Sequence, residues 1–185
     1  PPIDPLRESI VMSLETCLGR EQNVFEQSSE HADRIIISSP VLSHSKMQQL
    51  RDVEKERAGY AVVDINLNYP EAEGLQAAVA RICEEAAQAI RDGKTLLVLT
   101  DKNIREGFLP ANSALVTGAV HHYLIQVGLR TDANILVETG FARDPHQFAV
   151  LLGFGATAIY PYLAYDVIND LVAKGELLGD PIYAQ

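Results

Sequence analysis

Polar side chains that could carry chemistry recur where four short apolar segments end. Asp64 and Asn66 end the first segment, Asp101 and Lys102 follow the second, Glu138 and Thr139 the third, and Tyr160 ends the fourth. In α/β sheets and barrels, functional groups gather at the carboxyl ends of the strands. Carboxylates converging there could bind Mg²⁺ or transfer protons, and a desolvated lysine could act as a base or form a Schiff base. The same residues are also ordinary polar caps and ion-pair partners of strand ends, and no spacing among them is diagnostic of an active site.

The last two of these strand ends offer few groups for a phosphate. Barrel enzymes often anchor phosphate on glycine-rich loops and the N-terminus of a short helix. The third loop reads TGFAR, in which Gly140 is the one glycine and the bulky Phe141 follows it. The fourth reads YPY, in which Pro161 lacks an N–H. Arg143 could supply charge, but a lone arginine is more often a surface ion-pair partner, so we expect no flavin phosphate site.

Histidines and cysteines give no metal-binding pattern. His121 and His122 are adjacent on an expected helix, so their side chains point about 100° apart and cannot both face one ion. His146 has no partner at the spacing of a metal site. Cys17 and Cys83 lie far apart on apolar faces, which predicts neither a disulfide nor a metal knuckle and fits a reducing cytoplasm.

Hydrophobic periodicity predicts four repeats of strand and helix in the larger part of the chain, residues 59–176. Strands are expected over 60–67, 95–100, 133–138 and 156–160, and helices over 72–92, over 112–128, from the Asp144-Pro145 cap onward, and over 162–174. The strands are apolar on both faces, as parallel strands covered by helices must be. Four βα units predict an α/β fold with a parallel sheet, half of an eight-stranded TIM barrel. The pattern leaves open whether the sheet is open or curled.

Residues 1–58 are predicted to be helical and extended, with no sheet of their own. A helix is expected over 5–18, started by Asp4-Pro5 and ended by Gly19. Its apolar stripe comprises Leu6, Ile10, Leu14 and Cys17. We expect this helix to pack across an open edge of the half-barrel, because an unprotected sheet edge invites association.

The rest of this N-terminal part contains one further helix. Residues 20–33 lack periodicity and are expected to form a loop, and a short β-branched run follows over 34–38. Ser43 could cap a helix of about 44–57.

Length and charge limit the possible partners. The 185 residues fit one domain, 1–185, large enough to bury a core. Fifteen Lys and Arg against 25 Asp and Glu give a net charge of −10, which repels nucleic acid and anionic lipid. No apolar run approaches the roughly 20 residues of a membrane helix, so we expect a cytoplasmic protein with neither kind of partner. The chain begins Pro1-Pro2 rather than with Met, so we expect a fragment of a larger multidomain chain.

Four stretches of the sequence resemble one family. They are PPIDPLRESIVMSLETCLG at 1–19, SSPVLS at 38–43, GAVHHYLIQVGLR at 118–130 and VETGFARDPHQFAVLLGFGATAIYPYLAYD at 137–166. They resemble the central domain of the glutamate synthase large subunit, most of all that of the bacterial NADPH-dependent enzyme. The resemblance runs from the first residue to about 175. It departs at Phe141, where a polar residue is expected, and over 101–112, which weakens any role for Lys102.

The resemblance implies a function shared with other domains. In that family an amidotransferase domain releases ammonia from glutamine, and a barrel with FMN and an iron–sulfur cluster uses it to convert 2-oxoglutarate to glutamate. NADPH enters through a small subunit, and the central domain, a rudimentary relative of the flavin barrel, joins the two catalytic ends. The family's catalytic cysteine, flavin-binding residues and cluster cysteines have no counterpart here. We therefore expect no catalytic, cofactor-binding or metal residue in this chain, and those neighbouring domains as its partners.

Three hypotheses follow. The first is a non-catalytic connecting domain of glutamate synthase. The second is a freestanding metal-dependent, barrel-like enzyme that uses Asp64, Asp101, Lys102 and Glu138, and the third is an autonomous protein–protein interaction module.

Successive residues of one helix also predict a contact with another domain. His121, His122 and Tyr123 lie on a helix whose apolar stripe includes Leu115, Ala119 and Leu124. At 100° per residue they cover nearly all of the remaining arc, so at least one must point away from the core. We expect the exposed member to serve an interdomain contact.

Overall fold

The architecture is built around a parallel sheet of four strands. A computed structural model describes residues 6–7 and 11–177. The strands are β3 (Val62–Asn66), β5 (Leu96–Thr100), β7 (Asn134–Glu138) and β8 (Ala158–Tyr160), in the order β3-β5-β7-β8. All three pairings are parallel. The α/β class and the four βα units are confirmed, and the strand order is the chain order, as it is between neighbouring strands of a βα barrel.

Each strand is followed by a helix. The helices are α3 (Leu75–Arg91), α4 (Ser113–Gln126), α5 (Pro145–Gly153) and α6 (Tyr162–Ala173), and α2 (His44–Asp52) precedes the sheet. Short 3₁₀ turns lie at Ser29–Ala32, Val53–Lys55, Glu71–Glu73 and Arg130–Asp132. Ser43 and Asp144 cap α2 and α5 as predicted, because their side chains accept from the N–H groups of Lys46 and Gln147.

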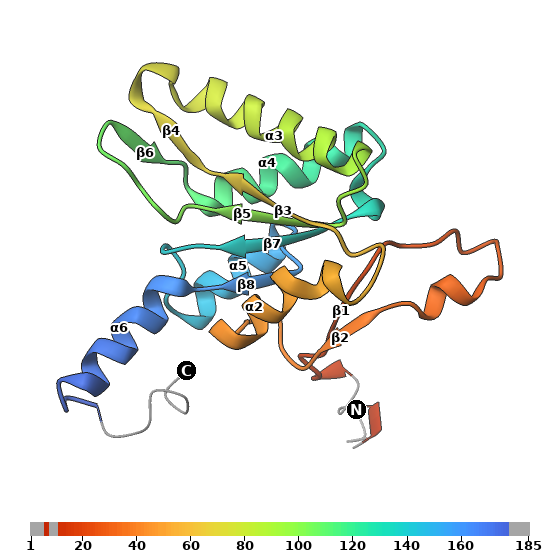
Figure 1. The fold of residues 1–185 in the computed structure, drawn as a ribbon, viewed down its shortest axis with the longest axis horizontal. Helices are drawn as coiled ribbons and strands as arrows, with labels where there is room; N and C mark the ends of the chain where they lie inside the picture. Colours follow the sequence, from red (N-terminus) through yellow and green to blue (C-terminus); the bar gives the residue numbers. More distant parts are fainter. Residues whose placement is uncertain (1–5, 8–10, 178–185) are drawn as a thin grey trace.

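The two faces of the sheet pack against different helices. Leu97 and Leu99 belong to a buried cluster with side chains of α3, α4 and α5, whereas Leu96 and Val98 belong to a second cluster with side chains of α2. In Figure 1, α3 and α4 lie on one side of the sheet and α2 on the other. A strand buried on both sides needs apolar residues at every position, which explains the unbroken LLVL of β5.

The sheet is open, and a helix fills the side that a barrel would turn inward. Crossover helices cover the outer face of a βα barrel, so α2 occupies the inner side. Beyond β8 the sheet continues through residues 40–42, since Leu42 N–H donates to Ile159 O at 2.8 Å and Ile159 N–H donates to Pro40 O at 2.7 Å. This segment, rather than an N-terminal helix, therefore protects the β8 edge.

The prediction of a helix over 5–18 is borne out at Leu6, Arg7 and Val11, which are helical, but it is wrong beyond residue 12 and in its buried stripe. Thr16–Leu18 forms β1, which pairs antiparallel with β2 (Ile35–Ile37), so the N-terminal part has a small sheet of its own. Leu6 and Leu14 are exposed, and Ile10 lies outside the described residues. Apolar residues at helical spacing do not show where the helix ends. Here the last of them belong to a short strand, in which Leu18 is buried in the second cluster.

A second small sheet was not predicted. β4 (Asn68–Pro70) and β6 (Phe108–Pro110) pair antiparallel beyond the carboxyl ends of β3 and β5. Both strands have three residues and include a proline, and they lack the alternation that identifies longer strands. The expected loop around Gly107 and Pro110 therefore contains a strand.

The turn between α5 and β8 lies against His121. Arg130 Nε donates to His121 Nδ1 at 2.9 Å, and the same guanidinium donates to Ala133 O and Gly155 O at 2.8 and 3.0 Å. Burial, then the charge of Arg130, lowers the pKa of His121, which matches its acceptor role. The predicted exposure of at least one residue among 121–123 is confirmed, because His122 is exposed.

We expect Gly155→Ala to destabilise the domain by about 3 kcal/mol. Gly155 has φ +111°, and a Cβ there would lie 2.5 Å from His121 Cγ, so the substitution adds backbone strain to a collision. Gly153→Ala is the matched control, since a Cβ there meets no atom within 4 Å. Urea unfolding should place this control within about 1 kcal/mol of the unmodified protein. Equal effects of the two substitutions would contradict the packing described.

Candidate site at the carboxyl ends of the strands

The structure brings the predicted polar residues to one edge of the sheet. β3 carries Asp64 and Asn66, β5 leads into Asp101 and Lys102, β7 ends at Glu138 before Thr139, and Tyr160 ends β8. Asp101, Glu138 and Thr139 are buried, whereas Asp64 is exposed. The expected convergence is therefore confirmed, and the partners of each group decide what the arrangement can do.

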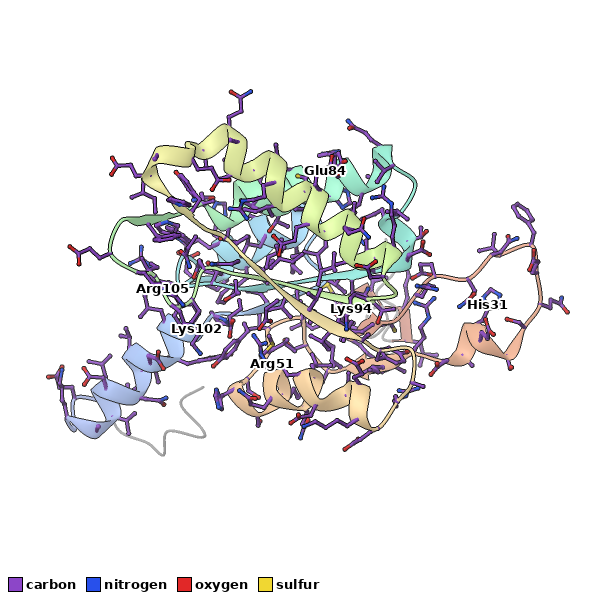
Figure 2. The ribbon with its side chains drawn as sticks, turned by 45° about the horizontal axis from the view of Figure 1, so that its top comes forward. His31, Arg51, Glu84, Lys94, Lys102 and Arg105 are labelled. Carbon is purple, nitrogen blue, oxygen red and sulfur yellow. The ribbon has the colours of Figure 1, made fainter. Side chains whose placement is uncertain are left out.

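An arginine from α2 joins two of the carboxylates. Arg51 Nη1 donates to both carboxylate oxygens of Asp64 at 2.6 Å, and Arg51 Nη2 donates to Glu138 Oε2 at 3.1 Å. Burial disfavours the charged guanidinium, but the hydrogen bonds and charges of Asp64 and Glu138 outweigh it and raise the pKa of Arg51. Figure 2 labels Arg51 and Lys102 near this part of the sheet. Sequence reasoning missed Arg51, because nothing in a predicted helix shows which strand end its polar face will meet.

Glu138 is held by three other groups. Its side chain is 5% exposed, and besides Arg51 it accepts from Thr100 Oγ1 at 2.6 Å. Lys102 Nζ lies 3.9 Å from the other oxygen, at the limit of an ion pair. The Glu138 carboxylate is thus buried, hydrogen-bonded and paired with a cation.

Asp101 is bound by the loop that would otherwise cradle a phosphate. Its carboxylate accepts from the hydroxyl of Thr139 and, at 3.0 Å, from the N–H of Gly140. The next N–H, that of Phe141, donates to Thr139 Oγ1 at 3.0 Å. Consecutive loop donors are thus satisfied within the chain. A protein carboxylate therefore takes the loop donors that an anion would otherwise accept from.

Tyrosines close the other side of the cluster. Burial, then the charge of Asp101 and a hydrogen bond donated to it, raises the pKa of Tyr162. The Lys102 ammonium lies 5.5 Å from the centre of the Tyr162 ring, a cation–π distance. The Tyr160 hydroxyl is 2.8 Å from His44 Nδ1 of α2. Each of these phenols is protonated at neutral pH and acts as a hydrogen-bonding contact.

A small cleft lies beside these residues. It has a volume of about 290 Å³, and its lining includes Asp64, Asn66, Thr100 and Lys102. The buried Asn68 also lines it and donates to the backbone oxygens of Asp101 and Lys102 at 3.2 and 3.0 Å. The side chain of Asn68 therefore ties the start of β4 to the segment after β5.

The other sequence candidates are not brought together. Cys17 is exposed, and Cys83 is buried in α3, where burial raises the pKa of its thiol. The rings of His121 and His122 meet edge to face at 5.2 Å. Within residues 6–7 and 11–177, no group of three histidine, cysteine, aspartate or glutamate side chains could hold a metal ion. The metal-dependent enzyme gains no support from this arrangement.

Comparison with known proteins shows where the chain belongs. Residues 1–184 match the family described as the glutamate synthase central domain. The chain belongs to the glutamate synthase central-domain family. The resemblance of the four sequence stretches is thereby confirmed over almost the whole chain.

Relatives of this central domain come from several kingdoms. It is 36% identical to glutamate synthase [NADH] of Saccharomyces cerevisiae and 37% identical to the glutamate synthase [NADPH] large chain of Bacillus subtilis, over 96% of this chain in both cases. It is 40% identical to the chloroplastic ferredoxin-dependent enzyme of Oryza sativa over 90% of this chain. These matches cover 8%, 11% and 10% of the relatives, so the chain spans about a tenth of their length.

Solved structures resemble this chain only distantly. A mutant flavocytochrome b2 with bound pyruvate matches 69% of this chain and 29% of its own, with a TM-score of 0.43 and 16% identity. That likeness is too distant to carry an argument.

Among the helices that the structure describes, we find no candidate for a membrane span.

Proposed function

We propose that this central domain connects the glutamine amidotransferase domain to the FMN-binding synthase domain of a glutamate synthase, and that it carries no catalytic group of its own. The family match and the relatives support the first part. In the complete polypeptide the two neighbouring domains would convert glutamine and 2-oxoglutarate to glutamate. FMN, an iron–sulfur cluster and a small subunit that supplies electrons from NADPH would belong to those other parts, in the cytoplasm.

The observation that carries the proposal is the state of the strand-end carboxylates. Asp64 and Glu138 are paired with Arg51, and Asp101 accepts from its own loop. A catalytic carboxylate must exchange its partners for a substrate or a proton. Here each exchange would break a contact between α2 and the sheet or between β5 and β7. These groups therefore fix the relative positions of secondary-structure elements, as a connecting scaffold requires.

The test compares three reactions of the complete polypeptide carrying Arg51→Ala. We expect glutamine-dependent glutamate synthesis to fall several-fold, because loosening α2 disturbs the alignment of the two neighbouring domains. Glutamine hydrolysis and ammonia-dependent glutamate synthesis, each confined to one domain, should stay close to the values of the unmodified enzyme. Loss of either partial reaction in a fully folded variant would contradict a purely connecting role.

We also expect no binding of FMN by this domain. The N–H of Gly140 and the hydroxyl of Thr139 already donate to Asp101, which leaves too few donors for the phosphate. Titrating the protein into FMN while following flavin fluorescence is the measurement. Saturable quenching in the micromolar range would show the prediction to be wrong.

A further inference from the structure

The outer surface of α4 is uncharged and partly apolar, with Leu115, Ile125, His122 and Gln126 exposed, although a surface helix normally carries charged residues on that side. Leu115 and Ile125 are 49% and 52% exposed, and the exposed His122 lies between them. At helical spacing these three residues form one stripe. The opposite stripe, Val116 and Leu124 among its members, is fully buried in the core. Exposed leucine and isoleucine on the outer side of a helix without charged residues favour a second surface that covers them.

The apolar surface continues onto the end of α5. Phe154, 48% exposed, packs against α4 so closely that a Cβ on Gly118 would lie 3.1 Å from its ring. We call Leu115, His122, Ile125 and Phe154 the uncharged face. The sequences of α4 and α5, SALVTGAVHHYLIQ and PHQFAVLLG, contain no Asp, Glu, Lys or Arg.

The other described helices α2, α3 and α6 all contain charged residues. The protein has a net charge of −10, and the neighbouring α3 carries Arg81, Glu84 and Glu85 on its exposed side. Figure 2 labels Glu84 on that helix. Continuous apolar surface next to charged surface is the pattern of a protein interface.

A cleft at one end of α4 and α5 contains an arginine, so a partner that covers it should carry a negative charge there. It has a volume of about 320 Å³ between the N-terminal turns of α4 and α5, and its lining includes Phe141, Arg143 and Leu151. The Arg143 N–H donates to Gln147, and its guanidinium forms no ion pair with the residues that the structure describes. A partner carboxylate opposite Arg143 would complement this corner.

The length and charge of the chain favour one occupant. The relatives have about ten times the length of this domain, so most of their polypeptide lies outside it. Two copies of this domain would each bring a net charge of −10 and repel one another. We propose that a neighbouring domain of the same polypeptide covers the uncharged face with an apolar surface and places a carboxylate opposite Arg143. This inference rests on the proposed connecting function.

Hydroxyl-radical footprinting of the complete polypeptide tests the inference. Leu115 and Ile125 have same-type references of similar exposure in Leu75 and Ile104, which are 42% and 55% exposed. We expect oxidation of Leu115 and Ile125 to be lower than that of their references by about fivefold or more, since interface cores exclude water. Equal oxidation within both pairs would overturn the inference. So would protection that disappears on dilution, which would indicate a second copy.

Substitutions distinguish a failure of this proposed interface from a failure of the proposed connecting function. In the complete polypeptide, Ile125→Arg should raise the oxidation of Leu115 toward that of Leu75, whereas Gln88→Arg on the exposed side of α3 should not. If Leu115 is protected but Arg51→Ala leaves glutamine-dependent synthesis intact, the surface stands and the connecting function fails. If Leu115 is unprotected while Arg51→Ala uncouples the reactions, the surface alone is wrong.

Discussion

Asp101→Ala is expected to lower the free energy of unfolding by about 4 kcal/mol, a large fraction of the stability of a domain of this size. Asp101 is 2% exposed and accepts from the Thr139 hydroxyl and the Gly140 N–H. Removing the carboxylate leaves the buried Thr139 hydroxyl and the half-buried Gly140 N–H without this acceptor. The cost of leaving them unsatisfied is larger than the benefit of each hydrogen bond.

Urea unfolding of this variant should be compared with that of Asp52→Ala. Asp52 forms an ion pair with Lys55 at 2.6 Å, but both side chains are mostly exposed. Exposed pairs contribute about 0–1 kcal/mol, so the control should change little. A similar small loss in both variants would mean that the loop after β7 does not depend on Asp101.

Arg51→Ala should cost about 3 kcal/mol, because it leaves the Glu138 carboxylate buried without its main cation. Adding Glu138→Gln to this variant should recover part of the loss, since the neutral amide is less costly to bury. Arg81→Ala is the surface control: Arg81 pairs with Glu73 at 2.8 Å and with Glu85 at 3.6 Å on the outside of α3. It should cost about 1 kcal/mol or less. A double variant less stable than Arg51→Ala would contradict the account of Glu138.

The repeating part of the fold was predictable, because its elements follow local rules. The strands have apolar runs, α3 has a regular stripe, and Ser43 and Asp144 are caps whose chemistry depends on the next three residues. Leu115 shows where hydrophobic periodicity fails to predict burial. The periodicity places it in the buried stripe of α4, but it is half exposed. A helix without charged residues gives no signal of which side faces the core.

The long-range contacts could not be predicted from the sequence. Convergence of Asp64, Asp101 and Glu138 follows from the parallel sheet. The ion pairs of Asp64 and Glu138, however, depend on Arg51, which comes from a helix on the opposite side of the sheet from the crossovers. The pairing of β1 with β2 likewise joins residues about 20 positions apart through three-residue strands. Such short strands are determined by tertiary packing more than by their own pattern.

Lys102 provides the most direct test of the central claim that the strand ends are structural. It is 43% exposed and only 3.9 Å from Glu138, so Lys102→Ala should leave the fold intact. The measurement is the kcat of glutamine-dependent glutamate synthesis by the complete polypeptide carrying this substitution. The account predicts a kcat within about twofold of the unmodified enzyme. A fall of about a hundredfold or more with an unchanged melting temperature would assign Lys102 a catalytic role and contradict the account.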